Sequence, residues 1–450
     1  MENNENQRRF TSWKEIAQYL GRDIRTCQRW EEKFGLPVYR VDPESPKSRV
    51  YAFKDELDEW LHQRKPPRTP IANAFLWLQT FKKRLLYLGL PALAGIIVIL
   101  ALFIPRLLGP SDPADFRIEG SKLVVLNAKG KELWHYETGL QNLVGETKYR
   151  ESFQFRRLKE SADRYLMPTL IMKDINADRR IEVLFSTQTE DEMGEGELIC
   201  FNDRGAELWR FKAGREMKFG STVYSPDYRI CGFDTYDVDN DGQLEIFISS
   251  LQIPHWPTQL VSLSSQGRML GEYWHSGYLN DFVFADLDKD GQTEIIFAGL
   301  NNEYRKACLI VFDAGNLNGS SPQTESEFRC PELGPGSEKY YILFPRTDFD
   351  MIANPVEAVE RMNILQNGYL SLSTSVSKII YILNSGLAVE SVIFSHGFIQ
   401  LHSEAVREGK IKSTLDEKYR ENLKKGVVYF DGQKWVNWPT PTGFLGETKN

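Results

Sequence analysis

The sequence lacks the short motifs that mark the common catalytic sites. It contains no G-x-S-x-G nucleophile elbow, no H-E-x-x-H zinc motif and no G-x-x-x-x-G-K phosphate loop. Histidine is scarce, and His255, His275, His396 and His402 show no spacing typical of metal ligands. We therefore expect a chain that is not an enzyme.

A strong overall charge is also missing. The formal net charge of the 450 residues is −7, so the average composition does not point to a nucleic acid partner. The hydrophobic fraction of 41% is ample for packed cores and argues against wholesale disorder. At this length the chain is expected to hold roughly three domains.

Charged residues are absent from one long apolar run, residues 85–104, "LLYLGLPALAGIIVILALFI". About 20 residues of helix span a hydrocarbon core of about 30 Å, so this run predicts a transmembrane helix. A buried core helix is the alternative. Acidic residues are missing from 60–84, whereas Arg64, Lys82, Lys83 and Arg84 precede the run. Because Lys and Arg accumulate on the cytoplasmic side, we expect an inside N-terminus and an outside C-terminal domain.

Residues 1–65 show the periodicity of a small helical domain. Ser12 and Glu15 form a capping-box start, and Trp13, Ile16, Ala17 and Leu20 then recur at helical spacing. After Gly21, the stretch "DIRTCQRWEEKF" predicts a second helix that buries Ile24, Cys27, Trp30 and Phe34. Strands over 38–41 and 49–53 and a helix that turns Leu57, Trp60 and Leu61 inward follow. The order predicts a winged helix-turn-helix domain.

This stretch resembles the MerR and excisionase families in its "RTxxRW"-like second helix, its basic wing and its closing "DELDEWL". The resemblance implies that the second helix and the wing contact DNA. Arginine suits guanine, glutamine suits adenine, and lysine neutralises phosphate. The expected DNA-binding residues are Arg22, Arg25, Thr26, Gln28, Arg29, Arg40, Lys47 and Arg49. The alternative is a solvated face in a domain that docks a protein. Residues 66–84, rich in proline and then in basic and aromatic residues, are expected to link this domain to the membrane.

Residues 114–450 contain two interleaved repeats. The acidic repeat reads "DINADRRIE" from 174, "DVDNDGQLE" from 237 and "DLDKDGQTE" from 286, each followed by an alternating apolar strand. Its glutamate comes at position nine and a strand follows, so these loops are not EF-hands. The other repeat places Gly, Leu and an aromatic residue at intervals of three, in hairpins that end at 139, 214 and 277. Such units predict an all-β propeller-like domain. We expect the last hairpin, near Trp438, to close the ring beside 124–136.

The acidic loop feeding a strand resembles the FG-GAP and VCBS repeats, including those of integrin-type propellers. That resemblance implies calcium bound by Asp237, Asp239, Asp241 and Glu245, and by Asp286, Asp288, Asp290 and Glu294. The first loop offers Asp174, Asn176, Asp178 and Glu182, but Arg179 stands where glycine belongs. Metal-free Asx turns are the alternative for all three loops.

Cysteine is sparse, with Cys27 expected in a core and Cys200, Cys231, Cys308 and Cys330 in the C-terminal domain. Cys308 and Cys330 are either a disulfide pair or core residues. Helices are expected over 354–365 and 413–426, and strands over 369–383.

In layout the chain resembles membrane-bound one-component regulators of bacteria. The expectation is a single-pass protein of the bacterial inner membrane whose outer propeller senses a ligand or partner and whose inner domain binds DNA, as a homodimer. The alternative is an envelope adhesion or scaffold protein whose cytoplasmic domain docks a protein. An envelope enzyme or glycan binder with a regulatory domain is a third, weaker alternative.

Overall fold

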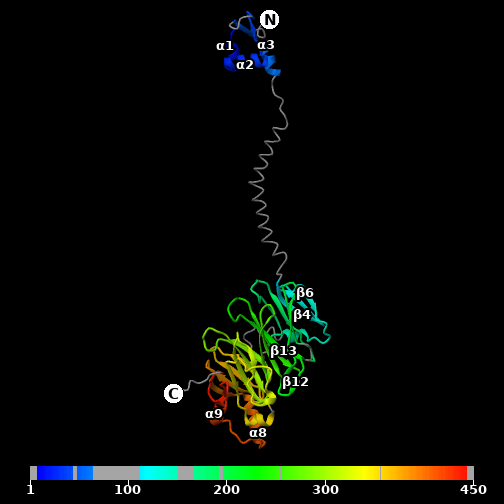
Figure 1. The fold of residues 1–450 in the computed structure, drawn as a ribbon, viewed down its shortest axis with the longest axis vertical. Helices are drawn as coiled ribbons and strands as arrows, with labels where there is room; N and C mark the ends of the chain where they lie inside the picture. The colour runs from blue at the N-terminus through cyan, green and yellow to red at the C-terminus, as the bar shows by residue number, and fades with distance from the viewer. Residues whose placement is uncertain are drawn as a thin grey trace. The chain divides into compact units, whose positions relative to one another are not determined.

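The computed structural model describes residues 8–43, 48–63, 112–150, 167–191, 196–253, 256–354 and 356–442. These fall into two compact units, one within residues 1–104 and one within 105–450 (Figure 1). The expected transmembrane segment, residues 85–104, lies outside the described residues. No helix in the described ranges is long and apolar enough to cross a membrane.

The N-terminal unit packs three helices against a small sheet. Helices α1 (Trp13–Leu20), α2 (Ile24–Phe34) and α3 (Lys54–Gln63) surround strands β1 (Arg9–Phe10), β2 (Tyr39–Arg40) and β3 (Val50–Phe53) in the order β1-β3-β2. Ser12 and Asp23 cap the first two helices, and Gly21 and Gly35 end them in the left-handed conformation that a C-terminal glycine favours. The sequence analysis missed β1.

The core of this unit is smaller than the helical periodicity suggests. Ile16, Ala17, Cys27 and Leu57 are buried, together with residues of the sheet. However, three residues that we expected to face inward are exposed, namely Ile24, Phe34 and Leu61. All three lie at or near the ends of α2 and α3.

The C-terminal unit is mostly β and propeller-like, built from successive sheets whose strands are antiparallel except for β20, which runs parallel to β16. The first two sheets contain β4 (Pro113–Glu119), β5 (Lys122–Asn127) and β6 (Glu132–Glu137), then β7 (Leu170–Lys173), β8 (Glu182–Ser186), β9 (Glu197–Phe201) and β10 (Glu207–Lys212). A two-stranded ribbon, β11 (Met217–Phe219) and β12 (Thr222–Tyr224), follows. The third sheet holds β13 (Tyr228–Tyr236), β14 (Glu245–Gln252), β15 (Thr258–Leu263), β16 (Met269–His275) and β20 (Asn318–Ser320).

The fourth sheet is the largest. It orders β17 (Gly277–Ala285), β18 (Glu294–Asn301), β19 (Lys306–Asp313), β21 (Tyr340–Leu343), β26 (Val428–Phe430) and β27 (Trp435–Val436). The fifth sheet holds β22 (Val359–Ile364), β23 (Leu370–Thr374), β24 (Ile379–Leu383) and β25 (Val389–Phe394). A 3-10 turn, Ser326–Phe328, and helices α7 (Asp348–Ala353), α8 (His396–Arg407) and α9 (Glu417–Lys425) complete the described elements.

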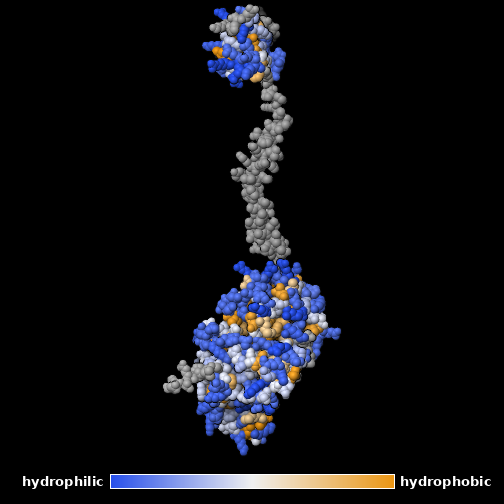
Figure 2. Space-filling model, in the orientation of Figure 1, coloured by the Kyte–Doolittle hydropathy of each residue, from blue (hydrophilic) through white to orange (hydrophobic). Residues whose placement is uncertain are grey.

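Neighbouring sheets in the chain share hydrophobic cores. One cluster joins the first sheet to the second, the next joins the second to the third, and two more continue to the fourth and fifth. In Figure 1 the first strands and the last helices accordingly lie at opposite ends of this unit. Figure 2 shows a visible face that is largely hydrophilic, with smaller hydrophobic patches between.

Two expectations for this unit are wrong. The last hairpin pairs with β21 in the fourth sheet, at Ile342 opposite Tyr429, and not with the first sheet at 124–136. Residues 359–364, within the helix expected over 354–365, form strand β22, because their backbone pairs antiparallel with that of β23, which leaves Val359 and Met362 buried. The helix expected over 413–426 is confirmed as α9, and the strands over 369–383 are confirmed as β23 and β24.

Candidate functional site

The three acidic repeats occupy equivalent positions in three sheets. Each is the loop between the first and second strand, β7 and β8, β13 and β14, or β17 and β18. The strand expected after each loop is present. The repeat in the sequence therefore corresponds to a repeat of local structure.

Carboxylates hold each loop in shape by accepting backbone hydrogen bonds. In the second loop Asp237 Oδ2 accepts from Gly242 N at 3.0 Å, and Glu245 Oε2 accepts from Val238 N at 3.0 Å. Asp239 and Asp241 each accept from the residue two positions later, which is the geometry of an Asx turn. The first and third loops repeat these bonds through Asp174, Asn176, Asp178 and Glu182, and through Asp286, Asp288, Asp290 and Glu294.

The sixth position of each loop has a positive φ. Gly242 and Gly291 adopt φ of 87° and 88°, which glycine reaches without strain. In the first loop Arg179 adopts φ of 68°. The arginine that departs from the repeat therefore keeps the backbone shape at some conformational cost, of order 1–2 kcal/mol.

The second loop best fits a hard cation. Oxygens of Asp237, Asp239 and Glu245 lie within 4.8 Å of one another. Asp237 Oδ1 is buried without a hydrogen-bond partner among the described residues, which leaves a carboxylate oxygen available for a metal ion. Burial raises the pKa of Glu245, because its charge is poorly solvated. Asp241 is not in this cluster; both its oxygens accept hydrogen bonds from Gln243.

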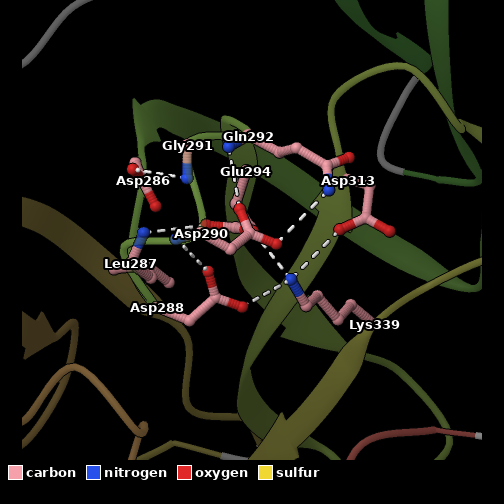
Figure 3. Close-up of polar contacts among 9 residues, drawn as sticks. All are labelled: Asp286, Leu287, Asp288, Asp290, Gly291, Gln292, Glu294, Asp313 and Lys339. Carbon is pink, nitrogen blue, oxygen red and sulfur yellow. Dashed lines mark hydrogen bonds and ion pairs between the residues drawn. The ribbon is translucent and has the colours of Figure 1, made fainter.

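The third loop has a different electrostatic arrangement. Asp286, Asp288 and Asp290 are exposed and also have oxygens within 4.8 Å of one another. Glu294 is not in this group: its Oε2 accepts from Leu287 N within the loop, and its Oε1 lies 2.8 Å from Lys339 Nζ, which also lies 2.8 Å from Asp288 Oδ2 (Figure 3). The hydrogen bond from Lys339 holds the pKa of Asp288 below its usual value.

The first loop does not assemble an acidic group of this kind in the described residues. Its third position is Asn176, whose amide nitrogen lies 3.4 Å from Glu182 Oε1. Asp174 Oδ1 is nevertheless buried without a partner, as in the second loop. Burial raises the pKa of Glu182.

The basic residues predicted to contact DNA lie mainly on one surface of the N-terminal unit. Arg22, Arg25, Gln28 and Arg29 are exposed, whereas Cys27, on the opposite side of α2, is fully buried. No ion pair engages these three arginines within the described part of the unit. Arg49 is exposed just before β3.

Two of the other predicted contacts are placed differently. Arg40 pairs with Glu31 at 3.1 Å and is partly buried. Thr26 donates its hydroxyl to Asp23 Oδ2 at 2.6 Å, which lowers the pKa of Asp23 and completes the helix cap. Lys47 lies outside the described residues.

Lys14 and Gln18 were missed by the sequence analysis. With Arg22, Asp23 and Arg25 they line a shallow groove of about 760 Å³ between the end of α1 and the start of α2. The groove therefore gathers three cationic side chains around Asp23, the N-cap of α2. The pairing of Lys14 and Gln18 at i and i+4 was the signal in the sequence.

No disulfide joins the five cysteines. Cys308 is buried in β19, where its Sγ lies 4.0 Å from His275 Nε2, and Cys330 follows the 3-10 turn. The alternative of core residues is therefore the one the structure favours for this pair. Burial lowers the pKa of His275 to about 4 and keeps the imidazole neutral.

No family model matches the chain. No curated protein matches it either. Similar solved structures include a rhamnogalacturonan lyase of Bacillus licheniformis, at 11% identity and TM-score 0.25, covering 48% of each chain. The Dos1 propeller has 7% identity and TM-score 0.29, covering 60% of this chain and 62% of its own. A Bacteroides caccae protein of unknown function has 11% identity and TM-score 0.27, covering 73% of this chain and 94% of its own.

These comparisons correct two expectations. The resemblance to the MerR and excisionase families, to FG-GAP and VCBS repeats and to membrane-bound one-component regulators is wrong as a family assignment, because no family model matches the chain and its similar structures include lyases and a propeller. The expectation of a chain that is not an enzyme is also contradicted, since three similar structures are rhamnogalacturonan lyases. The chain spans about half the length of the first two lyases that it matches, 50% and 47%. At these identities and TM-scores, the likeness assigns no activity or ligand to this chain.

Proposed function

We propose that the chain is a transcriptional regulator whose N-terminal unit binds DNA and whose C-terminal unit senses a ligand or a protein partner. The observation that carries the proposal is the surface of α2 and of the turn before it, where Arg22, Arg25, Gln28 and Arg29 are exposed. Arginine donates two hydrogen bonds to guanine, and glutamine suits adenine, so this surface has the chemistry of a major-groove reader.

The arrangement of α1 and α2 supports the same proposal. A Gly-containing turn joins them, so the second helix can enter a groove while the first crosses the phosphate backbone, as in a helix-turn-helix. Lys14, Arg22 and Arg25 in the adjacent groove would bind phosphate. Arg49 would contact the backbone from the hairpin. A unit of this size is expected to bind one half-site weakly, so we include dimerisation on DNA in the proposal.

In the C-terminal unit we propose a structural calcium ion at the second acidic loop, held by Asp237, Asp239 and Glu245. The buried and unpartnered Asp237 Oδ1 supports this assignment. Calcium prefers oxygen ligands and would relieve the repulsion among these carboxylates, tying the loop between β13 and β14 into one geometry.

The proposed location is a bacterial inner membrane, with the N-terminal unit in the cytoplasm and the C-terminal unit outside. This part rests on the sequence alone: the uncharged run over 85–104 and the basic residues before it.

A protein-docking role for the N-terminal unit is the second candidate. It is favoured by exposed apolar side chains, since Phe34 is 47% exposed and Val41 is 66% exposed. Genome-wide crosslinking of the intact protein to DNA separates the two. Discrete peaks support the DNA-binding proposal, whereas their absence from cells that contain the folded protein favours docking.

A further inference from the structure

Lys339 carries the positive charge at the third acidic loop. Its ammonium lies 2.8 Å from Asp288 Oδ2, 2.8 Å from Glu294 Oε1 and 3.2 Å from Asp313 Oδ1. Figure 3 shows the lysine side chain extending toward these three carboxylates. An ammonium group has three N–H donors, so the three acceptors can satisfy it completely.

The backbone holds this lysine in place. Lys339 N donates to Val311 O at 2.7 Å, and its carbonyl accepts from Thr442 N at 2.9 Å. The residue immediately precedes β21, which pairs with β19 at Val311. The main chain is hydrogen-bonded on both sides of the residue, so the ammonium group is held close to the loop. It therefore does not lose the translational freedom that a free ion loses when it binds.

The second loop has no equivalent of Lys339. In the part of the chain that the structure describes, none of its carboxylates forms an ion pair with a lysine or arginine. Its ninth residue, Glu245, joins Asp237 and Asp239 in the oxygen cluster. In the third loop the ninth residue, Glu294, is 1% exposed and is held by Lys339 instead. In both loops the ninth carboxylate accepts a backbone N–H of its own loop, but only Glu294 also pairs with a lysine among the described residues.

We propose that the ammonium of Lys339 serves as the resident cation of the third loop, so that a divalent ion enters this loop only by displacing it. The inference rests on the proposed calcium binding by the acidic loops and refines it to one loop. Two cations a few ångströms apart repel each other strongly in a partly buried site, so they do not share one set of carboxylates. Metal dependence then lies with the second loop, whereas Lys339 ties the third loop to the start of β21 in the same sheet.

The test counts calcium ions bound by the purified full-length chain, using isothermal titration calorimetry. We expect one calcium per wild-type chain and two per Lys339→Met chain, because Glu294 is then released to act as a ligand. Lys122→Met is the matched control. It removes one lysine that pairs with Glu137 on the first sheet, so it changes the net charge equally without touching an acidic loop.

Each outcome shows whether Lys339 keeps calcium out of the third loop. The inference holds if Lys339→Met binds one more calcium ion than the wild type and Lys122→Met does not. This is so even if the wild type binds no calcium, in which case the proposed calcium ion at the second loop is wrong. If wild type and Lys339→Met bind the same number of ions, the inference is overturned. The Asp239→Ala variant shows separately whether the wild-type ion lies in the second loop.

Loss of Lys339 leaves Glu294 buried without its cation, so the variant could unfold without calcium. Lys339→Met/Glu294→Gln removes that charge and keeps the three exposed aspartates. We expect this double variant to fold and to gain a calcium site at least tenfold weaker than the second loop's. Lys339→Arg keeps the positive charge and should gain no site; a gained site in this variant would contradict the inference.

Discussion

The indole of Trp134 lies over the glycine turn of the next sheet, where its Nε1 donates to Asp203 O at 3.1 Å. Trp209 repeats the contact one sheet later, with Nε1 donating to Ser265 O at 2.9 Å. Gly205 and Gly267 lie directly beneath the two rings. The Gly and aromatic residues of the hairpin repeat therefore form a lock between successive sheets, with the tryptophan of one sheet on the glycine of the next.

This contact predicts that Gly205→Ala destabilises the C-terminal unit. A Cβ there would lie 2.6 Å from Trp134 Cδ2, and the residue has φ of +81°. We expect a loss of about 1–3 kcal/mol from overpacking, in addition to the conformational strain. Gly130→Ala is the control, since Gly130 has φ of +73° and open space around its Cα. Equal losses of unfolding free energy in urea for the two variants would contradict the proposed lock.

Much of the local structure could be predicted from the sequence. The acidic loops, the strands after them and the glycine hairpins depend on turn chemistry within a few residues, so the repeats located them correctly. Residues 359–364 were misjudged as a helix, although they pair with β23, the next strand along the chain, as one arm of a hairpin. The partner of the last hairpin could not be predicted either, because strand pairing between Ile342 and Tyr429 depends on tertiary contacts.

The same limit applies to the candidate sites. The alternating aspartates predicted that the second and third loops are similar, and the backbone conformations of the two loops are indeed similar. Lys339 lies far from the third loop in sequence, so the difference between the loops could not be found by spacing. Likewise the pairing of Arg40 with Glu31 required the fold that brings β2 beside α2.

Calcium should stabilise the chain through the second loop. Binding to the folded state alone contributes about 2.7 kcal/mol at a concentration one hundred times Kd. We expect the full-length chain to melt at a higher temperature with calcium than with a chelator, and Asp239→Ala to remove most of this difference. Asp241→Ala is the matched variant, because Asp241 lies outside the oxygen cluster and should retain the calcium response. An unchanged wild-type melting curve would identify the loops as metal-free turns.

Two aspartates of α7 should give opposite pH dependences. Burial, with Glu357 close by, raises the pKa of Asp350 from 3.8 to about 7. The folded state then holds a proton that the unfolded state releases, so stability falls by up to about 1.4 kcal/mol per pH unit between pH 4 and 7. We expect Asp350→Asn to flatten this fall and to raise the melting temperature more at pH 7.5 than at pH 4.5.

Asp348 is the matched comparison for this pH experiment. Burial opposes its charge, but hydrogen bonds from Ser413 and Tyr419 outweigh that effect and lower its pKa below 3.8. A carboxylate whose pKa is lowered by folding stabilises the folded state at pH values above its pKa in the unfolded chain. Asp348→Asn should therefore lose stability at neutral pH and lose less at pH 3. If both variants shift in the same direction at pH 7.5, the assigned environments are wrong.

The proposed topology predicts opposite activities for two reporter fusions. An alkaline phosphatase, active only outside the cytoplasm, should be active after Asn450 and silent after Arg64, because basic residues flank 85–104 on its N-terminal side. The control is a green fluorescent protein at the same sites, which should give the reverse pattern. Activity of the phosphatase after Arg64 would place the N-terminal unit outside the cytoplasm, where it cannot reach DNA. That result would contradict the proposal of a transcriptional regulator.

The DNA-binding proposal predicts that Arg29→Ala weakens binding while the N-terminal unit stays folded. Arg29 is exposed on α2 next to the half-buried Trp30, so the change removes a charge and its donors without altering the core. A lost base contact should cost about 1–3 kcal/mol of discrimination, whereas a lost phosphate contact weakens binding to all sequences and flattens the salt dependence. The measurement is a titration of a dimerised 1–70 fragment, which contains the complete core of the unit, against sites recovered by crosslinking.

Arg49→Ala should act in the same direction, and Arg40→Ala provides the comparison, because Glu31 already neutralises that side chain. We expect a several-fold loss of affinity for Arg29→Ala and Arg49→Ala and a smaller loss for Arg40→Ala, with unchanged circular dichroism in all three. If Arg29→Ala and Arg49→Ala bind DNA as tightly as the wild type, this surface does not read DNA. The exposed Phe34 and Val41 would then direct the next experiments to a protein partner.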